Sequence, residues 1–283
     1  MTETTAKPPV ARPSETRPGP SAAVLLARAG QRRRRERGFV LGAQIAIALA
    51  LVAGMYLLNA VAGKLTMPRP DAVLQQSIKM WSDGTMLRGL GESLTVLGLG
   101  FLLSASTGIV LGILLGGFRF LGRVLDPFVN AMNSTPGAAF IPLIIVWFGL
   151  YTEAKVVVVW NAALFPILIN TAAGIANANK DLVEMGRAFG ANRATLFWSV
   201  MVPDALPSIL SGLRIGAAIC TVGTVIAELT MAQSGLGGLL ATAGNRFQMD
   251  RYFAVVIVLM ALGTAVTAVL RLAENRISRW RAS

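Results

Sequence analysis

The chain has 283 residues, of which 54% are hydrophobic and 14% charged, and its 26 Lys and Arg residues outnumber 14 Asp and Glu residues. Soluble domains average about 25% charged residues, so this composition predicts a membrane protein and makes nucleic-acid binding the weaker interpretation of the positive charge. The sequence contains no His and a single Cys, Cys220, which excludes an intramolecular disulfide, a Cys/His zinc site and catalysis by histidine. It also lacks the phosphate-binding patterns G-x-x-x-x-G-K-[ST] and G-x-G-x-x-G, so any use of nucleotide energy requires another chain.

Residues 1–38 differ in composition from the rest of the chain. They hold five of the 13 prolines, no aromatic residue, and the basic residues Arg32, Arg33, Arg34, Arg35 and Arg37. This composition cannot bury a core and predicts a disordered basic tail on the cytoplasmic side. Residues 39–283 are then expected to form one transmembrane domain.

Six apolar segments are long enough to cross a membrane, since a hydrocarbon core of ~30 Å takes about 20 helical residues. They are Phe39–Ala62, Gly91–Gly117, Val124–Gly149, Ala154–Ala176, Ala205–Met231 and Tyr252–Ala273. A cleaved signal peptide is the weaker interpretation of the first segment, because signal peptides have apolar cores of about 7 to 15 residues. The expected fold class is therefore an all-α integral membrane protein with six transmembrane helices.

The distribution of basic residues predicts the orientation. With the N-terminus in the cytoplasm, the inner segments carry 18 Lys and Arg residues and the outer segments seven. Because cytoplasmic segments are enriched in basic residues, both termini are expected in the cytoplasm of a bacterial cell, with the chain in its inner membrane.

Several residues within the spans are candidates for lining a translocation path or gate. The third span contains Asn133-Ser134-Thr135-Pro136-Gly137, which is expected to break the helix, and broken backbone at membrane depth is tolerated only against protein or a water-filled cavity. The candidates are Asn133, Pro136, Trp147, Phe148, Asn161, Asn170, Arg214 and Glu228. Interhelical hydrogen bonds are the alternative for the asparagines, an aromatic belt for Trp147 and Phe148, and snorkelling for Arg214. Glu228 lines the route or is held by backbone amides or by Arg246.

Small residues recur every four positions in two spans. The second span has Gly100, Ser104, Gly108, Gly112 and Gly116, and the fifth has Ser208, Gly212, Gly216, Cys220 and Thr224. Such rows allow helix backbones to approach closely. Packing within the chain is the favoured interpretation, and a homodimer seam along one row is the alternative.

The stretch 177–204 between the fourth and fifth spans predicts two short helices on the cytoplasmic face. Asp181 and Glu184 form a cap-like pair at the start of the first helix, and Gly190 ends it. Asn192 can cap a second helix, whose continuation Pro203 is expected to prevent. An amphipathic helix lying on the lipid interface is the alternative.

The same stretch resembles the coupling loop of importer permeases of the ATP-binding cassette class. Those permeases carry E-A-A, three residues, G, nine residues and I-x-L-P. Glu184, Gly190 and Pro203 match this pattern in this sequence, whereas Met185 and Gly186 depart from the two alanines. The resemblance implies that the loop docks on an ATPase, with contacts from Asp181, Glu184, Met185, Arg187, Phe189, Gly190, Asn192 and Pro203.

Residues 68–280 further resemble the permeases of nitrate, sulfonate and taurine importers. The resemblance is carried by Thr135-Pro136, Ile141-Pro142-Leu143, Trp147-Phe148-Gly149, Leu206-Pro207-Ser208-Ile209 and Ala227-Glu228 with Ser234-Gly235-Leu236-Gly237. It implies an importer that works as a pair of permeases, with two cytoplasmic ATPase subunits that hold ATP and Mg²⁺ and an extracytoplasmic solute-binding protein. The chain itself is expected to hold no cofactor or metal, to be no enzyme, and to move a small, anionic solute such as a sulfonate, nitrate, taurine or an aromatic acid.

Two other functions fit the composition less well. A secondary transporter driven by an ion gradient usually carries ionisable relays near the bilayer midplane, and this sequence has almost none there. A membrane-embedded enzyme would need clustered acids and bases at catalytic spacing, which the sequence lacks.

Overall fold

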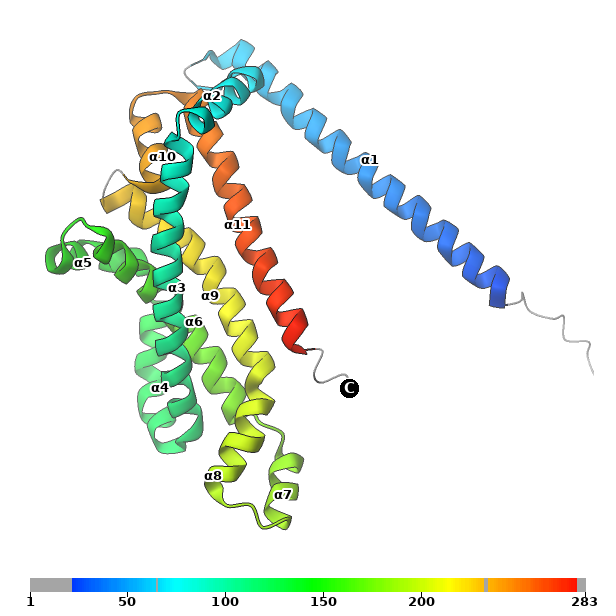
Figure 1. Ribbon diagram of the computed structural model, residues 1–283, viewed down its shortest axis with the longest axis vertical. Helices are drawn as coiled ribbons and strands as arrows, with labels where there is room; N and C mark the ends of the chain where they lie inside the picture. The colour runs from blue at the N-terminus through cyan, green and yellow to red at the C-terminus, as the bar shows by residue number, and fades with distance from the viewer. Residues whose placement is uncertain (1–21, 65, 232–233, 279–283) are drawn as a thin grey trace, which may run out of the picture. The chain divides into compact units, whose positions relative to one another are not determined.

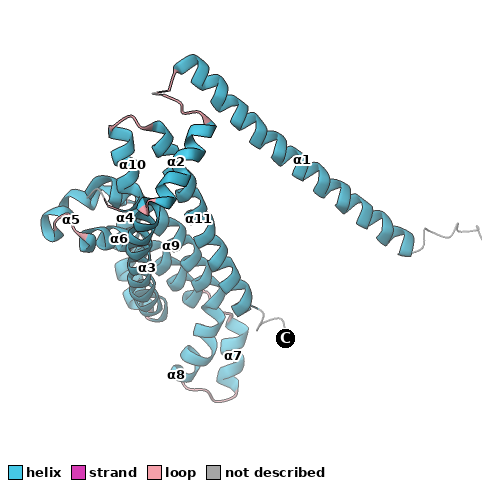
Figure 2. Ribbon diagram, turned by 45° about the horizontal axis from the view of Figure 1, so that its top comes forward, coloured by secondary structure: helices cyan, strands magenta, loops and turns pink. Residues whose placement is uncertain are grey.

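The computed structural model describes residues 22–64, 66–231 and 234–278, and all secondary structure within these ranges is helical (Figure 2). The chain divides into two compact units, residues 1–54 and residues 55–283. Helix α1 (Ala22–Ala62) belongs to both units and contains a membrane-length apolar stretch, Gly42–Ala62. The second unit holds all the remaining helices.

Four further spans are present in the second unit. They are α3 (Thr85–Gly117), α6 (Thr152–Ala176), α11 (Met249–Ser278) and a segment, Arg193–Met231, that ends in α9 (Val202–Met231). Together with α1, five helices of the described chain are long and apolar enough to cross a membrane, or six spans if the bent pair described next counts as one. The prediction of an all-α membrane protein is confirmed.

The third predicted span is broken near its middle. Helix α4 (Arg119–Ser134) is followed by a 3-10 turn, η1 (Gly137–Phe140), and by α5 (Ile141–Phe148), and the two halves are bent by 89°. Thr135 takes an extended conformation, φ −78° and ψ 127°, as the residue before a proline tends to do. The predicted break is therefore confirmed, and the span begins at Arg119 rather than Val124.

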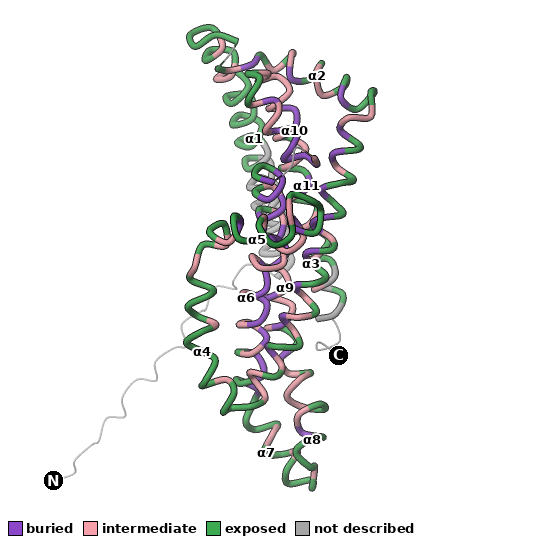
Figure 3. The backbone as a smooth tube through the Cα atoms, turned by 90° about the vertical axis from the view of Figure 1, so that its left-hand side faces the viewer, coloured by how far each residue is buried: buried purple, intermediate pink, exposed green. Residues whose placement is uncertain are grey.

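Helix α6 lies at the centre of the second unit and is buried along much of its length (Figure 3). Small residues of α3 and α9 pack against it. A Cβ on Gly112 of α3 would lie 2.8 Å from the Leu168 carbonyl oxygen of α6, and one on Gly212 of α9 would lie 2.8 Å from the Asn170 Cβ of α6. The two rows of small residues therefore pack within the chain, and neither is free to form a seam with a second copy.

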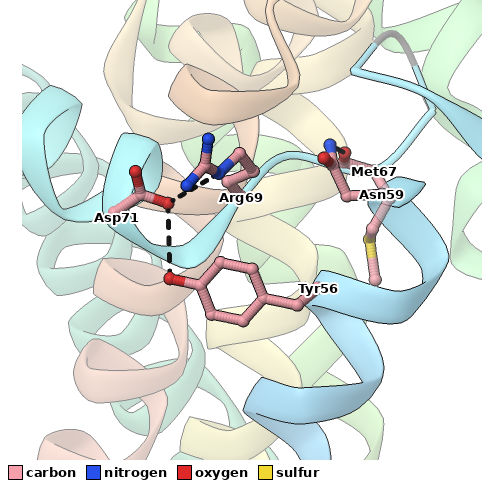
Figure 4. A network of polar contacts seen from close by, with 5 residues as sticks. All are labelled: Tyr56, Asn59, Met67, Arg69 and Asp71. Atoms are coloured by element: carbon pink, nitrogen blue, oxygen red, sulfur yellow. Dashed lines mark hydrogen bonds and ion pairs between the residues drawn. The ribbon is translucent and has the colours of Figure 1, made fainter.

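Short helices lie at the two ends of this unit (Figure 1). Helices α2 (Pro70–Ser82) and α10 (Gly235–Asn245) lie at one end, and α7 (Lys180–Ala188) and α8 (Arg193–Leu196) at the other. Near α2, Asp71 accepts a hydrogen bond from the Tyr56 hydroxyl at 3.4 Å and forms an ion pair with Arg69 Nε at 3.2 Å, and Asn59 donates to the Met67 carbonyl (Figure 4). These contacts fasten the end of α1 to the start of α2.

The prediction of a disordered tail over residues 1–38 is wrong for its second part, because α1 begins at Ala22. Residues 1–21 lie outside the described residues. Ala, Leu and Arg are among the strongest helix formers, and they dominate residues 22–35. Residues 22–38 are therefore a helical extension that continues into the first span, which the proline and arginine content of residues 1–38 did not predict.

Candidate translocation route and coupling loop

The loop between α6 and α9 folds into two short helices, as predicted, but with a different first cap. Asn179 is the N-cap of α7, and its side-chain oxygen accepts a hydrogen bond from the Asp181 backbone N–H at 2.9 Å. The prediction that Asp181 and Glu184 cap the helix is wrong, since both lie inside α7. Asn179 and Asp181 both precede the apolar residues of α7, and Asn and Asp are equally good N-cap residues. The sequence alone therefore did not decide between them.

Gly190 ends α7 with a left-handed turn, as predicted. Its φ is +79°, its N–H bonds to the Arg187 carbonyl at 2.9 Å, and the Ala191 N–H bonds to the Gly186 carbonyl at 3.0 Å. This pair of bonds is the Schellman motif, which needs a residue that tolerates positive φ. A side chain at Gly190 would meet no atom within 4 Å, so only backbone strain restricts the position.

The second short helix begins as predicted and does not end as predicted. Asn192 Oδ1 accepts a hydrogen bond from the Thr195 N–H at 2.8 Å, which caps α8. Pro203 does not stop the chain, because α8 continues through a π-helical turn, η2 (Phe197–Met201), directly into α9. Proline is tolerated in the first turn of a helix, and a π turn accommodates the change in hydrogen bonding. Helix α8 and the fifth span, α9, are therefore one continuous helical segment.

The outer surface of the loop is exposed and partly apolar. Glu184, Arg187, Met185 and Phe189 are all exposed, and Phe189 is 86% accessible. At Gly186 a Cβ would lie 2.6 Å from Leu196 Cδ2 of α8. The departure from alanine at Gly186 thus allows the two helices to approach closely, and it leaves the exposed surface available for a partner.

The break in the third span opens a cavity of about 290 Å³ against α6. Asn133, Pro136 and Asn161 line it, together with Ser134 and Thr135. Polar side chains and freed backbone groups thus meet a partly open space, as expected of irregular backbone in a membrane. We call this space the break cavity.

Three of the proposed path residues lie elsewhere. Asn170 donates a hydrogen bond to the Pro166 carbonyl at 2.8 Å within α6. Trp147 and Phe148 are 68% and 45% exposed at the end of α5 and do not line the break cavity. Their role as belt or plug stays a prediction.

Helix α4 carries a polar face that lines more than the break cavity. The residues are Arg119, Arg123, Asp126, Asn130 and Asn133, which fall within about 100° of one another around a helix at 3.6 residues per turn. Below the break cavity, Arg123 and Asp126 line a hollow of about 280 Å³ with Leu168 and Ala172 of α6. Both spaces lie between α4 and α6, so the polar face follows α4 from its first turns to the break.

Arg214 is held by an ion pair. Its Nη1 lies 3.1 Å from Glu274 Oε2 of α11, and the two side chains are 43% and 29% exposed. This ion pair links α9 to α11, and the role of Arg214 in snorkelling or in attracting a solute stays a prediction.

Glu228 of α9 is buried against the start of α10, and both of its carboxylate oxygens have hydrogen-bond donors. Ser93 Oγ lies 2.8 and 2.9 Å from its two carboxylate oxygens, and the Gly237 N–H donates to Oε2 at 2.8 Å. The Leu236 N–H donates to Ser93 Oγ at 2.8 Å, and the Gly235 N–H donates to Glu92 Oε2 at 2.6 Å. We call Glu92, Ser93, Glu228 and these three amides the α10 carboxylate cluster.

The cluster explains why glycines follow Ser234. A Cβ on Gly237 would lie 2.6 Å from Glu228 Cβ, and one on Gly235 would overlap the Glu228 carboxylate. Of the alternatives considered for Glu228, backbone amides are confirmed as its partners. In the part of the chain that the structure describes, no ion pair joins Glu228 to Arg246, which caps the far end of α10.

Residues 108–279 match the family described as the inner membrane component of binding-protein-dependent transport systems. The chain belongs to this family. Over 247 residues the permease is 30% identical to a putative aliphatic sulfonates transport permease of Bacillus subtilis, with 87% of this chain and 88% of that protein covered. It is likewise 30% identical over 221 residues to the taurine transport system permease of Escherichia coli, with 76% and 80% covered. The methionine transporter MetNI in an inward-facing conformation shares the fold, with a TM-score of 0.58, 22% identity, and coverage of 69% of this chain and 94% of that one.

The family confirms the resemblance derived from the loop motif and places this permease among the subunits of ATP-binding cassette importers, whose ATPase is a separate chain. Neither a secondary transporter nor a membrane enzyme is supported.

Sequence reasoning missed four residues of the permease's polar face, Arg119, Arg123, Asp126 and Asn130. Their spacing with Asn133 is helical and was visible in the sequence. They were overlooked because the apolar residues between them keep the mean hydropathy of the segment high. Pro127 lies within α4 and does not break it.

Proposed function

We propose that this permease imports small organic anions, with sulfonates first among them, along the polar face of α4. The observation that carries the proposal is the row of polar residues on one side of α4, with Arg123 and Asp126 at the hollow of about 280 Å³ and Asn133 at the break cavity. A row of charged and amide side chains is costly against lipid, so it belongs against water or protein. The similarity to sulfonate and taurine permeases supports the choice of solute class.

The route needs a second wall. The residues of α4 that form the polar face are exposed, and α6 covers only one edge of the helix. We assign the other wall to a second copy of the permease, with an extracytoplasmic binding protein delivering the solute. Two cytoplasmic ATPase subunits, which hold ATP and Mg²⁺, complete the importer.

The α7–α8 loop is the part of the permease suited to receive the ATPase. It protrudes from one end of the unit, exposes Phe189 and Glu184, and continues through η2 into α9 without a break. A movement of the loop would therefore move a span. Nucleotide state would bias two arrangements of the pair by differential binding to the loop.

Asn130→Leu and Asn161→Leu test the route. Each replaces a polar group of the proposed path by an apolar one of similar size, and solute uptake into vesicles should fall while the ATPase still co-purifies. Thr95→Leu is the control, because Thr95 is exposed and bonds only to the Gly91 carbonyl of its own helix. Normal uptake by both asparagine variants would refute the route.

The orientation follows from the same proposal and is tested separately. In a Cys220→Ala background, single cysteines at positions 20 and 190 should be reached only from the cytoplasm, and one at position 75 from outside. Labelling of position 190 from outside intact cells would reverse the assignment of the loop.

A further inference from the structure

A lysine is buried near the start of a membrane span, where ionisable residues are rare. Lys155 lies in the first turns of α6 and is 2% exposed. Its ammonium group donates to the Ser234 hydroxyl. Across the described ranges the two ion pairs are Arg69–Asp71 and Arg214–Glu274, so no carboxylate lies within 4 Å of Lys155 Nζ. The bond to Ser234 uses one of the three N–H donors of the ammonium group.

The carboxylates near this lysine are already committed. Glu228 binds Ser93 and the Gly237 amide, and Glu92 binds the Gly235 amide. Glu153 is exposed on the first turn of α6. Glu228 is close enough to interact with Lys155 through its charge, although no ion pair within 4 Å joins them in the described ranges. An ionisable residue in a membrane span is a functional-site candidate by default.

Lys155 lies against a hollow of about 620 Å³, which we call the Lys155 hollow. Ser234 and Thr152 contribute hydroxyl groups to its lining, Phe148 and Tyr151 contribute aromatic rings, and Glu153 lies on it as well. Helical side chains cover the turn that precedes them, so Lys155 is directed to the start of α6.

The start of α6 adds donors to the same place. Its N-cap, Tyr151, makes no capping hydrogen bond through its side chain. The first-turn amides of this 25-residue helix lie beside the hollow and receive no capping bond from the Tyr151 side chain. Uncapped amides at a helix N-terminus favour an anion, and the buried ammonium is a second, independent feature that favours the same ligand.

We infer that Lys155, Ser234 and the first turn of α6 bind the sulfonate or carboxylate group of the transported solute, with the Phe148 and Tyr151 rings against its apolar part. The inference rests on the proposed function and adds a residue that selects for anions at a place apart from the α4 route. Glu153 sets the limit of this selectivity, because its carboxylate opposes a second negative charge on the solute.

The test is direct binding of ethanesulfonate to the purified permease–ATPase assembly in lipid nanodiscs, followed by tryptophan fluorescence. Ethyl methyl sulfone, which has a similar shape and no charge, is the matched probe. Lys155→Met should weaken ethanesulfonate binding about tenfold or more, as expected for loss of a charged hydrogen bond, and leave sulfone binding unchanged. Lys155→Arg should retain most of the affinity, and Glu153→Gln should raise it.

Two outcomes would overturn the inference. One is ethanesulfonate binding that stays the same in Lys155→Met, Lys155→Arg and Glu153→Gln. An unmodified assembly that does not bind ethanesulfonate at all would count in the same way. The other is an equal loss of sulfonate and sulfone binding in Lys155→Met. If Lys155→Met does not assemble, two other measurements decide: Glu153→Gln should raise the affinity for ethanesulfonate, and added salt should lower it. The Asn130→Leu and Asn161→Leu uptake measurements do not involve Lys155, so failure of this site and failure of the proposed route are distinguishable.

Discussion

The α10 carboxylate cluster and the polar face of α4 both place charges within the apolar part of the chain, and they treat those charges in opposite ways. In the cluster, Glu228 is 1% exposed and meets two donors from other segments. On α4, Arg123 is exposed and bonds only to the Arg119 carbonyl of its own helix, at 3.3 Å. Satisfied buried charges fix a structure, whereas unsatisfied polar groups beside a hollow are available to water and solute. On the proposed route, the first region serves stability and the second serves transport.

The largest effect is expected in the cluster. Glu228→Ala leaves the Gly237 amide and the Ser93 hydroxyl without their acceptor in a buried place, which should cost roughly 3 kcal/mol and lower the yield of folded permease. The midpoint of thermal unfolding in detergent measures the change. Asp126→Ala on the α4 face is the matched removal of a carboxylate and should leave this midpoint nearly unchanged. If the two variants were equally stable, the distinction between the regions would be lost.

A second effect concerns the small residues that hold α6. Gly112→Leu places a side chain against the Leu168 carbonyl and Thr171, and overpacking of this kind should cost about 2 kcal/mol. Gly98→Leu on the same helix is the control, because a Cβ there meets no atom within 4 Å. Equal unfolding temperatures for the two leucine variants would mean that α3 does not pack on α6 through this row.

The α7–α8 loop should separate function from stability. Gly190→Val forces a branched residue into a positive φ at a local cost of about 1 kcal/mol or more, and it re-aims α7 against α8. Uptake and solute-stimulated ATP hydrolysis should fall together, and the ATPase should be retained less well on purification.

Gly84→Val controls for the backbone strain. Gly84 has a φ of +75° and open surroundings like Gly190, but it lies between α2 and α3 at the other end of the unit. Normal coupling in Gly190→Val, or an equal loss in Gly84→Val, would remove the loop from the mechanism.

The smallest effect is expected at Arg214. Its ion pair with Glu274 is partly exposed, so Arg214→Gln should cost less than about 1 kcal/mol. Uptake of an anionic solute at saturating concentration should stay normal, because this arginine does not lie on the α4 face. A selective loss of anion uptake would return Arg214 to the route.

The sequence was sufficient for features that local chemistry determines. Hydropathy located the spans, Pro136 located the break, and Gly190 and Asn192 took the conformation and the cap that their side chains favour. It was insufficient where two local signals competed, as for Asn179 against Asp181, and where a proline could be absorbed by a helix start, as at Pro203.

Non-local contacts were the other source of error. Ser93 and Glu228 are 135 residues apart, so no spacing rule links them, and the depth and role of Glu228 could not be predicted. The same holds for Lys155 and Ser234, whose contact joins α6 to the start of α10. The polar face of α4 was readable in the sequence, but its importance depends on the hollows that α6 forms beside it.

Cysteine accessibility along α4 tests the central claim most directly. In a Cys220→Ala background, single cysteines replace Arg119, Arg123, Asp126, Asn130 and Asn133 on the polar face, and Phe120, Val124 and Phe128 on the apolar face. A charged, water-soluble thiol reagent should label the five polar positions of the assembled importer and block uptake, and it should leave the three apolar positions unlabelled. Equal labelling of both faces, or an unreactive polar face, would contradict a solute route along α4.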